Sequence, residues 1–288
     1  MTITKIKLLE KLLAAALAVV LLAAAIDCGR PMEPANRILS RRFLAIKADP
    51  PEAAPGEPVT FSALIVNKDS SLYDGATAWV VLSGDIARLT GNFNFNPEDL
   101  PCVPSVGQPV CDWTVPDKDT FEQKYGPLTD TGMMLTLGSA ASKTGAVTTN
   151  IDDLILAFKL FVVSERPEDE RFTNPTLVKI IAVDSKGREV LPDATDGAFH
   201  THSGTLYLRA CMDDSCGDHE TSNMTFHWFS TVPDMESQFT HTQKVAPGKH
   251  GSFPVYCVVN ERDSFVHSGN VTTFFAGIDW KQVEVVFE

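Results

Sequence analysis

The sequence predicts an all-β protein made of two β-sandwich domains behind an N-terminal leader. Short runs of β-branched and aromatic residues recur along the chain, and several of them alternate apolar with polar residues. Gly, Pro, Asn and Asp separate these runs, a pattern that is typical of strands joined by turns. With 288 residues, of which the first 27 form the leader, the chain has room for two domains of ordinary size.

The N-terminus has the composition of a secretory signal. Three lysines precede an apolar run at residues 12–26, and Cys28 follows directly after Asp27. A helix that crosses a bilayer needs ~20 apolar residues, so this run is short for a membrane span and fits the apolar part of a signal peptide. We therefore predict that residues 1–27 are removed and that residues 28–42 form a tether.

Strand-like runs continue from the tether to the end of the chain. Apolar residues occupy every second position at 59–65 and at 283–287, and 155–163 is an apolar run of strand length that only Lys159 interrupts. The other predicted strands are 43–48, 77–82, 177–183, 205–210, 224–229 and 253–259. A short helix is predicted at 117–124. We expect long loops at 92–131, which is the candidate binding surface, and at 138–153, because small, polar and turn-forming residues dominate there.

A charged segment divides the chain after the leader into two parts. Residues 165–171 (ERPEDER) contain no apolar residue except proline. We therefore predict one β-sandwich at 43–164, a linker at 165–173 and a second β-sandwich at 174–288.

The overall charge and the absence of catalytic motifs narrow the function. The net charge of −13 and pI near 4.9 argue against a nucleic-acid partner, because phosphate binding needs a basic face. The sequence has no Gly-x-Ser-x-Gly, no His-Glu-x-x-His and no glycine-rich phosphate loop. We therefore expect no enzyme activity and no soluble cofactor.

The cysteines suggest two disulfides in short loops. Cys102 and Cys111 are nine residues apart, and Cys211 and Cys216 are five apart. In an oxidising compartment, such pairs are expected to be bonded. Cys257 lies in an apolar run and is predicted to be a buried free thiol.

Two histidines give the sequence an alternative function. His200 and His202 are two residues apart, so they lie on one face of any strand that contains them. This spacing can bind copper or zinc. The alternative hypothesis is therefore a periplasmic or surface metal-binding protein that uses the histidines of the second domain.

The end of the leader resembles the lipobox of bacterial lipoproteins, whose cysteine becomes the lipidated first residue. Residues 25–28 (AIDC) carry this resemblance, with Asp27 where the family has Gly, Ala or Ser. The resemblance implies that Cys28 carries lipid and that the membrane is a partner. Cleavage after Ala25 is the alternative, and it would give a secreted protein.

Both halves resemble bacterial immunoglobulin-like (PKD-like) modules, and the first is similar to those of surface lipoproteins of the myxobacterial type. Residues 43–61 (FLAIKADPPEAAPGEPVTF) carry the resemblance in the first half. In the second half, 225–230 (TFHWFS) resembles strand C, with Trp228 in the core, and 255–260 (VYCVVN) resembles strand F. The family implies a fold and a location but no catalytic residues.

The resemblance also bears on the disulfides of the second domain. Cys211, Trp228 and Cys257 follow the Cys–Trp–Cys order of antibody domains, which would favour a bridge between Cys211 and Cys257. Because 206, 208 and 210 form an apolar face, Cys211 is expected to point outward, and we prefer the bridge to Cys216. The chain is thus expected to be a structural or adhesion module of the cell envelope, with an envelope protein or polysaccharide as its partner.

Overall fold

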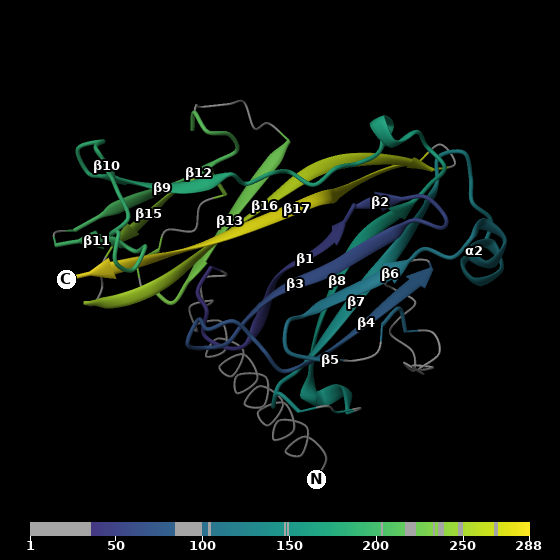
Figure 1. Ribbon diagram of the computed structural model, residues 1–288, viewed down its shortest axis with the longest axis horizontal. Helices are drawn as coiled ribbons and strands as arrows, with labels where there is room; N and C mark the ends of the chain where they lie inside the picture. Colours follow the sequence, from purple (N-terminus) through teal and green to yellow (C-terminus); the bar gives the residue numbers. More distant parts are fainter. Residues whose placement is uncertain are drawn as a thin grey trace, which may run out of the picture. The chain divides into compact units, whose positions relative to one another are not determined.

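The structure is a computed structural model, and the fold it shows is all-β (Figure 1). It describes residues 36–83, 100–102, 105–146, 148, 150–202, 204–216, 223–232, 234–235, 239–246, 250–267 and 270–288. Cys28 and the predicted signal lie outside these residues.

The first β-sandwich is formed by two sheets of mainly antiparallel strands. One sheet has the order β1 (Arg42–Asp49), β3 (Pro58–Val66), β6 (Val110–Thr114). The other has the order β2 (Glu52–Ala53), β8 (Leu154–Val163), β7 (Met133–Ser142), β4 (Ala76–Ser83), β5 (Ser105–Val106), and only β2 pairs in parallel, with β8. Phe61, Trp79, Leu135 and Phe161 are buried between the sheets.

The second β-sandwich has the strand order of an immunoglobulin constant-type domain. One sheet runs β10 (Glu189–Val190), β9 (Lys179–Asp184), β12 (Leu206–Cys211), β15 (Thr242–Ala246), β14 (Asp234–Met235). The other runs β11 (Phe199–Thr201), β17 (Asn270–Phe287), β16 (Gly251–His267), β13 (Met224–Ser230). With β9, β12, β15 and β14 as strands A, B, E and D, and β13, β16 and β17 as C, F and G, this is the immunoglobulin arrangement. The first sandwich follows the same plan, so the predicted fold class is confirmed.

The predicted helix is present as α2 (Lys118–Tyr125). The carboxylate of Asp117 accepts a hydrogen bond from the Thr120 N–H at 3.0 Å, which satisfies one of the free amides of the first turn. Phe121 is fully buried in the core of the first sandwich, so the helix closes one end of that core. Two further short helical turns are η3 (Ile151–Asp153) and η4 (Glu168–Glu170).

Two segments that we expected to be loops contain strands. Residues 138–142 belong to β7, although they are small, and 105–106 and 110–114 form β5 and β6. The reason at β7 is crowding from its neighbours. A Cβ atom on Gly138 would lie 2.8 Å from Cγ1 of Val80 on β4, so a larger side chain has no room there.

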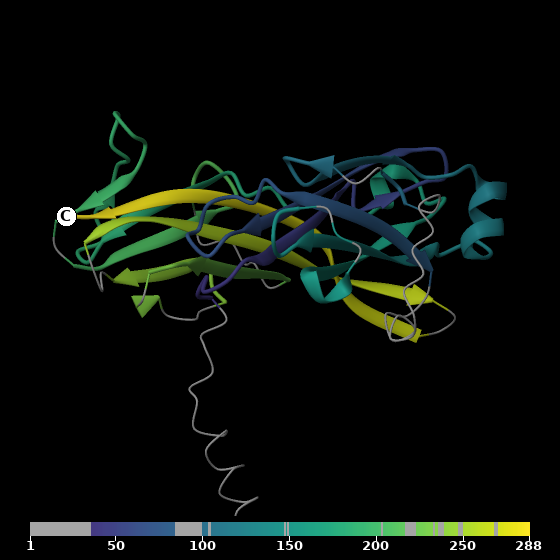
Figure 2. The same ribbon diagram turned by 90° about the horizontal axis from the view of Figure 1, so that it is seen from below.

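The hairpin of β16 and β17 is much longer than predicted. Its strands continue beyond residue 259 to His267 and restart at Asn270, with a register shift between Asn260 and Arg262. Figures 1 and 2 show this hairpin running out of the second sandwich and alongside the first. Phe274 and Ala276 pack on Val162 of β8, so the hairpin contacts both domains.

Gly277 on β17 allows the hairpin to lie against the segment that joins the two domains. A Cβ atom at this position would contact the Thr173 carbonyl oxygen and lie 2.6 Å from Pro175 Cδ. We predict that Gly277→Ala lowers the free energy of unfolding by about 1–3 kcal/mol through overpacking. Urea unfolding would measure this. The matched control, Gln282→Ala at an exposed position of the same strand, should stay within about 0.5 kcal/mol of wild type. Equal stability of the two variants would contradict the packing described.

Candidate functional site

An apolar interface joins the two sandwiches, and we call it the junction. Its buried residues are Ala45, Leu64 and Val66 of the first sandwich, Tyr256, Val258 and Ile278 of the second, and Ile38, whose N–H donates to the Ser230 carbonyl oxygen on β13. The Tyr256 hydroxyl donates a hydrogen bond to the Ser70 carbonyl oxygen, and burial raises the pKa of Tyr256 to about 12. Residues 36–288 form one compact unit. The two sandwiches share the apolar cluster of the junction in addition to their own cores.

Polar bonds border the junction where the chain enters the second sandwich. The Asn174 side chain donates to the Ala48 carbonyl oxygen at 2.9 Å and accepts from the Ile278 N–H at 3.0 Å. Asp279 accepts from the Leu177 N–H at 2.9 Å and lies 3.4 Å from Lys47 Nζ. Asn174 therefore binds main chain from both sides of the interface, whereas Asp279 binds main chain of the second sandwich and the Lys47 side chain of the first.

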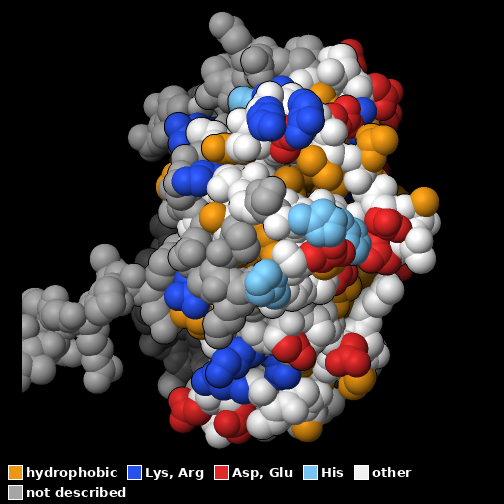
Figure 3. All heavy atoms as spheres, turned by 90° about the vertical axis from the view of Figure 1, so that its left-hand side faces the viewer, with side chains coloured by type: hydrophobic (Ala, Val, Ile, Leu, Met, Phe, Trp, Pro, Cys, Tyr) orange, Lys and Arg blue, Asp and Glu red, His pale blue; other side chains and the backbone are white. Residues whose placement is uncertain are grey.

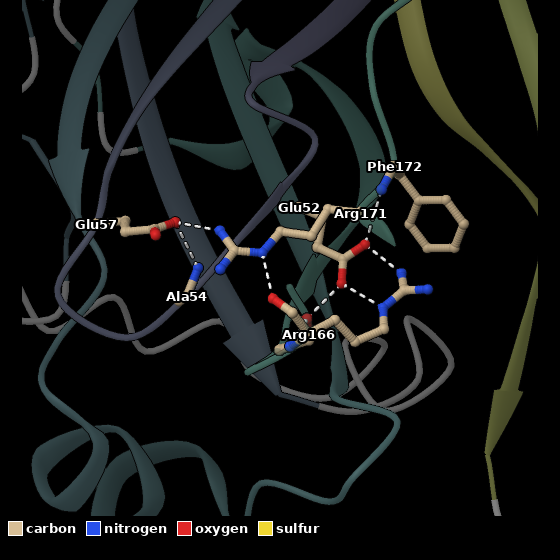
Figure 4. Close-up of polar contacts among 7 residues, drawn as sticks. Glu52, Ala54, Glu57, Arg166, Arg171 and Phe172 are labelled. Atoms are coloured by element: carbon tan, nitrogen blue, oxygen red, sulfur yellow. Dashed lines mark hydrogen bonds and ion pairs between the residues drawn. The ribbon is translucent and has the colours of Figure 1, made fainter. Parts of the chain in front are cut away.

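A buried carboxylate holds the charged segment 165–173 against the first sandwich (Figure 4). The side chain of Glu52 is 0% exposed and accepts hydrogen bonds from the Ser164 hydroxyl and from the Phe172 N–H at 2.9 Å. Arg166 binds the same carboxylate through Nε, at 2.9 Å, and through Nη2. We call these groups the Glu52 cluster. In it, the buried carboxylate of Glu52 accepts hydrogen bonds from Ser164, Arg166 and Phe172, as Figure 4 shows, so its charge is compensated.

A second ion pair, between Arg171 and Glu57, fixes the same segment further along the chain. Arg171 Nη1 lies 2.6 Å from Glu57 Oε2, and its Nε donates to the Arg166 carbonyl oxygen at 2.8 Å. The Ala54 N–H donates to Glu57 and, together with Arg171, holds the pKa of that carboxyl below its usual value. The segment is thus bound to the turn that precedes β3. We missed this from the sequence, although the opposite charges of Glu52, Glu57 and the two arginines were its signal.

The cysteines predicted to form disulfides are bonded as preferred. Cys102 pairs with Cys111, and Cys211 pairs with Cys216. Cys211 is 2% exposed but lies outside the core cluster that contains Leu206, Leu208 and Ala210, as expected for a side chain on the opposite face of β12. It reaches Cys216 because the chain turns back directly after β12, where Cys216 has a φ of 50°.

Trp228 and Cys257 lie in the core of the second sandwich. They face each other across the pairing of β13 with β16, and both are buried. The Trp228 indole N–H donates to the Thr240 carbonyl oxygen at 3.0 Å. Cys257 is a free thiol, and burial raises its pKa well above the usual range. The strand-C position inferred for Trp228 agrees with the observed strand order.

His200 and His202 meet at one end of the second sandwich, around the carboxylate of Glu288. His200 Nδ1 lies 2.7 Å from Glu288 Oε1, His202 Nδ1 lies 2.8 Å from Glu288 Oε2, and His200 Nε2 lies 3.0 Å from Asp196 Oδ2. Figure 3 shows histidine and acidic side chains beside one another on this end. Both ring nitrogens of His200 and Nδ1 of His202 thus lie against carboxylate oxygens. Over the described ranges, no group of three or more His, Cys, Asp or Glu is arranged to hold a metal ion.

Among the described residues, no helix is long and apolar enough to cross a membrane.

Of residues 92–131, the structure describes 100–102 and 105–131, which include the Cys102–Cys111 disulfide, β5, β6 and α2. Val106 and Val110 beside this disulfide are 69% and 40% exposed.

Comparison with known proteins gives matches among solved structures. The D0-D1 domain of intimin is 13% identical, with 85% of this chain and 99% of that chain covered, at a TM-score of 0.24. The fibronectin(III)-like modules of Clostridium thermocellum CbhA are 9% identical, with 86% and 94% covered, at 0.23. The Bacteroides ovatus mixed-linkage glucan utilization protein SGBP-B, in complex with a mixed-linkage heptasaccharide, is 9% identical, with 86% and 70% covered, at 0.21. No family model and no curated protein matches the sequence.

TM-scores of this size carry no argument, so the class of the protein rests on its own strand order. Both sandwiches have the immunoglobulin-like arrangement of strands A, B and E in one sheet and C, F and G in the other. The chain is therefore an all-β protein with two immunoglobulin-like domains and two disulfides.

The Glu52 cluster gives the first test of the site. We predict that Glu52→Gln lowers the free energy of unfolding by about 2–3 kcal/mol, because it leaves the Arg166 guanidinium without its buried anion. The matched control is Glu57→Gln, whose carboxylate is partly exposed and should cost about 0.2–1 kcal/mol. Urea unfolding would measure both. If Glu52→Gln cost no more than the control, the cluster would not hold the segment as described.

The histidines give a prediction about pH. Glu288 and Asp196 raise the pKa of His200 above 6.5, whereas burial lowers the pKa of His227 below it. Protonated His200 therefore adds stability that is fully present below the unfolded pKa and is lost as the pH rises through the folded pKa. His227 has the opposite sign, and stability falls as the pH drops below its unfolded pKa.

NMR titration of the imidazole Cε1–H resonances would check these two shifts. In Glu288→Gln, the pKa of His200 should move back toward its ordinary value while that of His227 stays unchanged. A His200 resonance that titrates below pH 6.5 in the wild type would show that the ion pairs do not form.

Proposed function

We propose that this chain is a non-enzymatic lipoprotein of the cell envelope, whose two immunoglobulin-like domains act together as a structural or binding module. The observation that carries the proposal is the junction, because its buried residues hold both domains as one unit, and the Glu52 cluster fixes the segment between them. A pair of domains held in this way can present its end loops at a defined distance and orientation. Tandem domains on a free linker would not do so.

The location follows from covalent chemistry and from the leader. Two disulfides favour an oxidising compartment, since cytosolic thiols are kept reduced. The signal-like residues 1–27 and the lipobox-like residues 25–28 support export and attachment through a lipid on Cys28. The likeness of residues 43–61 to surface lipoproteins of the myxobacterial type supports the same assignment.

The partner would be an envelope protein or a polysaccharide, bound at the end loops of the first sandwich. The described part of 92–131 supports this choice, because the Cys102–Cys111 disulfide constrains a segment on which Val106 and Val110 are exposed. Exposed apolar side chains on a constrained segment bind a partner at low cost in conformational entropy.

Lipidation is the part of the proposal that can be tested directly. We predict that the wild-type protein sediments with membranes and has an intact mass equal to the chain from Cys28 plus a diacylglycerol and an acyl chain. Cys28→Ser should lose the lipid and move to the soluble fraction, with an unchanged β-sheet circular dichroism spectrum. A lipid-free wild-type mass that begins near Ile26 would overturn the lipoprotein assignment.

A further inference from the structure

A groove of about 410 Å³ lies where the long hairpin crosses the first sandwich. Its walls come from β1, β8, β16 and β17, so both domains contribute to it. Phe43, Phe158, Phe274 and Phe275 line it, and Phe275 is 40% exposed. Ligand sites in proteins are typically concave, aromatic and apolar, with a few polar groups, and measure about 300–1,000 Å³.

Lys159 on β8 is the charged side chain among the residues that line this groove. It is 7% exposed, and its Nζ donates to the carbonyl oxygens of Phe275 at 3.0 Å and Ala276 at 2.7 Å. Within the described part of the chain, these two carbonyls are its partners and no carboxylate pairs with it. An ammonium group has three N–H donors, so one is left over.

A lysine buried in this way lowers the stability of the fold if it has only a structural role. Burial lowers the pKa of Lys159 to about 7, because the charged form is poorly solvated there. A methionine would fill the same space without this cost. An anion in the groove would pair with the ammonium and use its remaining donor, and the low local dielectric would strengthen that pair.

We propose that this groove binds a small amphipathic anion, whose apolar body packs among the phenylalanines and whose acidic group pairs with Lys159. Asn260 and Thr273 also line the groove and supply uncharged polar groups beside the same site. Because its walls come from both domains, such a ligand would contact β1 and β8 of the first sandwich and the hairpin of the second at once. The site does not depend on lipidation or on a partner at the end loops.

The test uses two fluorescent probes that share their rings but differ in charge. Anilinonaphthalene sulfonate is an aromatic anion, and phenylnaphthylamine is its uncharged analogue. The mature wild-type protein should bind one sulfonate probe per chain, about tenfold more tightly than the uncharged probe, because a charge-assisted bond of this kind is worth about one factor of ten.

Two lysine variants of equal charge then locate the anion. Lys159→Met should bring the affinity for the sulfonate down to that for the uncharged probe. The matched control Lys281→Met, on β17 and outside the groove lining, should leave the preference for the sulfonate unchanged. Thermal unfolding followed by circular dichroism would show that each variant is folded.

A third variant keeps the test valid if Lys159→Met does not fold. Thr273→Trp places a large side chain at the groove and should weaken the binding of both probes. No saturable binding of the sulfonate to wild type, equal wild-type affinity for both probes, or a sulfonate preference that survives in Lys159→Met would each overturn the proposal. In the last two cases Lys159 would serve only to hold the β17 carbonyls.

Discussion

Strands β3, β8 and β16 each carry apolar side chains on both faces. The core of a sandwich buries only one face of each strand. In β16, Val255, Cys257 and Val259 enter the core of the second domain, while Tyr256 and Val258 point the other way, into the junction. β3 does the same with Ala63 and Ile65 inside and Leu64 and Val66 outside. A single domain in water would expose these outer faces, so the two domains must cover each other.

Other features of the molecule agree with this constraint. The hairpin of β16 and β17 extends far enough for Phe274 and Ala276 to cover Val162 on the outer face of β8. Gly277 lets β17 approach Thr173 and Pro175, and the Glu52 cluster keeps the preceding segment in place. These polar contacts set the path of the chain, whereas the apolar faces give the reason for the two domains to stay together.

Most of the fold was predictable, because strand periodicity and turn residues are local signals. The predicted strands, the helix at α2 and the order of strands C and F around Trp228 all agree with the structure. Strand β7 (Met133–Ser142) was not predicted. The glycine at position 138 reflects crowding from Val80, which lies far away in the sequence.

The junction had a signal in the sequence that is clear in retrospect. The runs at 155–163, apart from Lys159, and at 253–259 are apolar at successive positions rather than alternating, which is the pattern of strands that are buried on both faces. What the sequence does not give is the element that covers each face, since that depends on contacts between residues far apart in the chain, such as Lys47 and Asp279, which are 232 positions apart. The Glu52 cluster and the groove at Lys159 depend on the same long-range packing.

Differential scanning calorimetry of the mature protein tests most directly whether the two domains form one unit. If the outer faces of β3, β8 and β16 are stable only when they are covered, both domains should unfold in one transition, and the calorimetric and van't Hoff enthalpies should agree. Two separate transitions, each with its own enthalpy, would show that each domain is stable alone and would contradict this account.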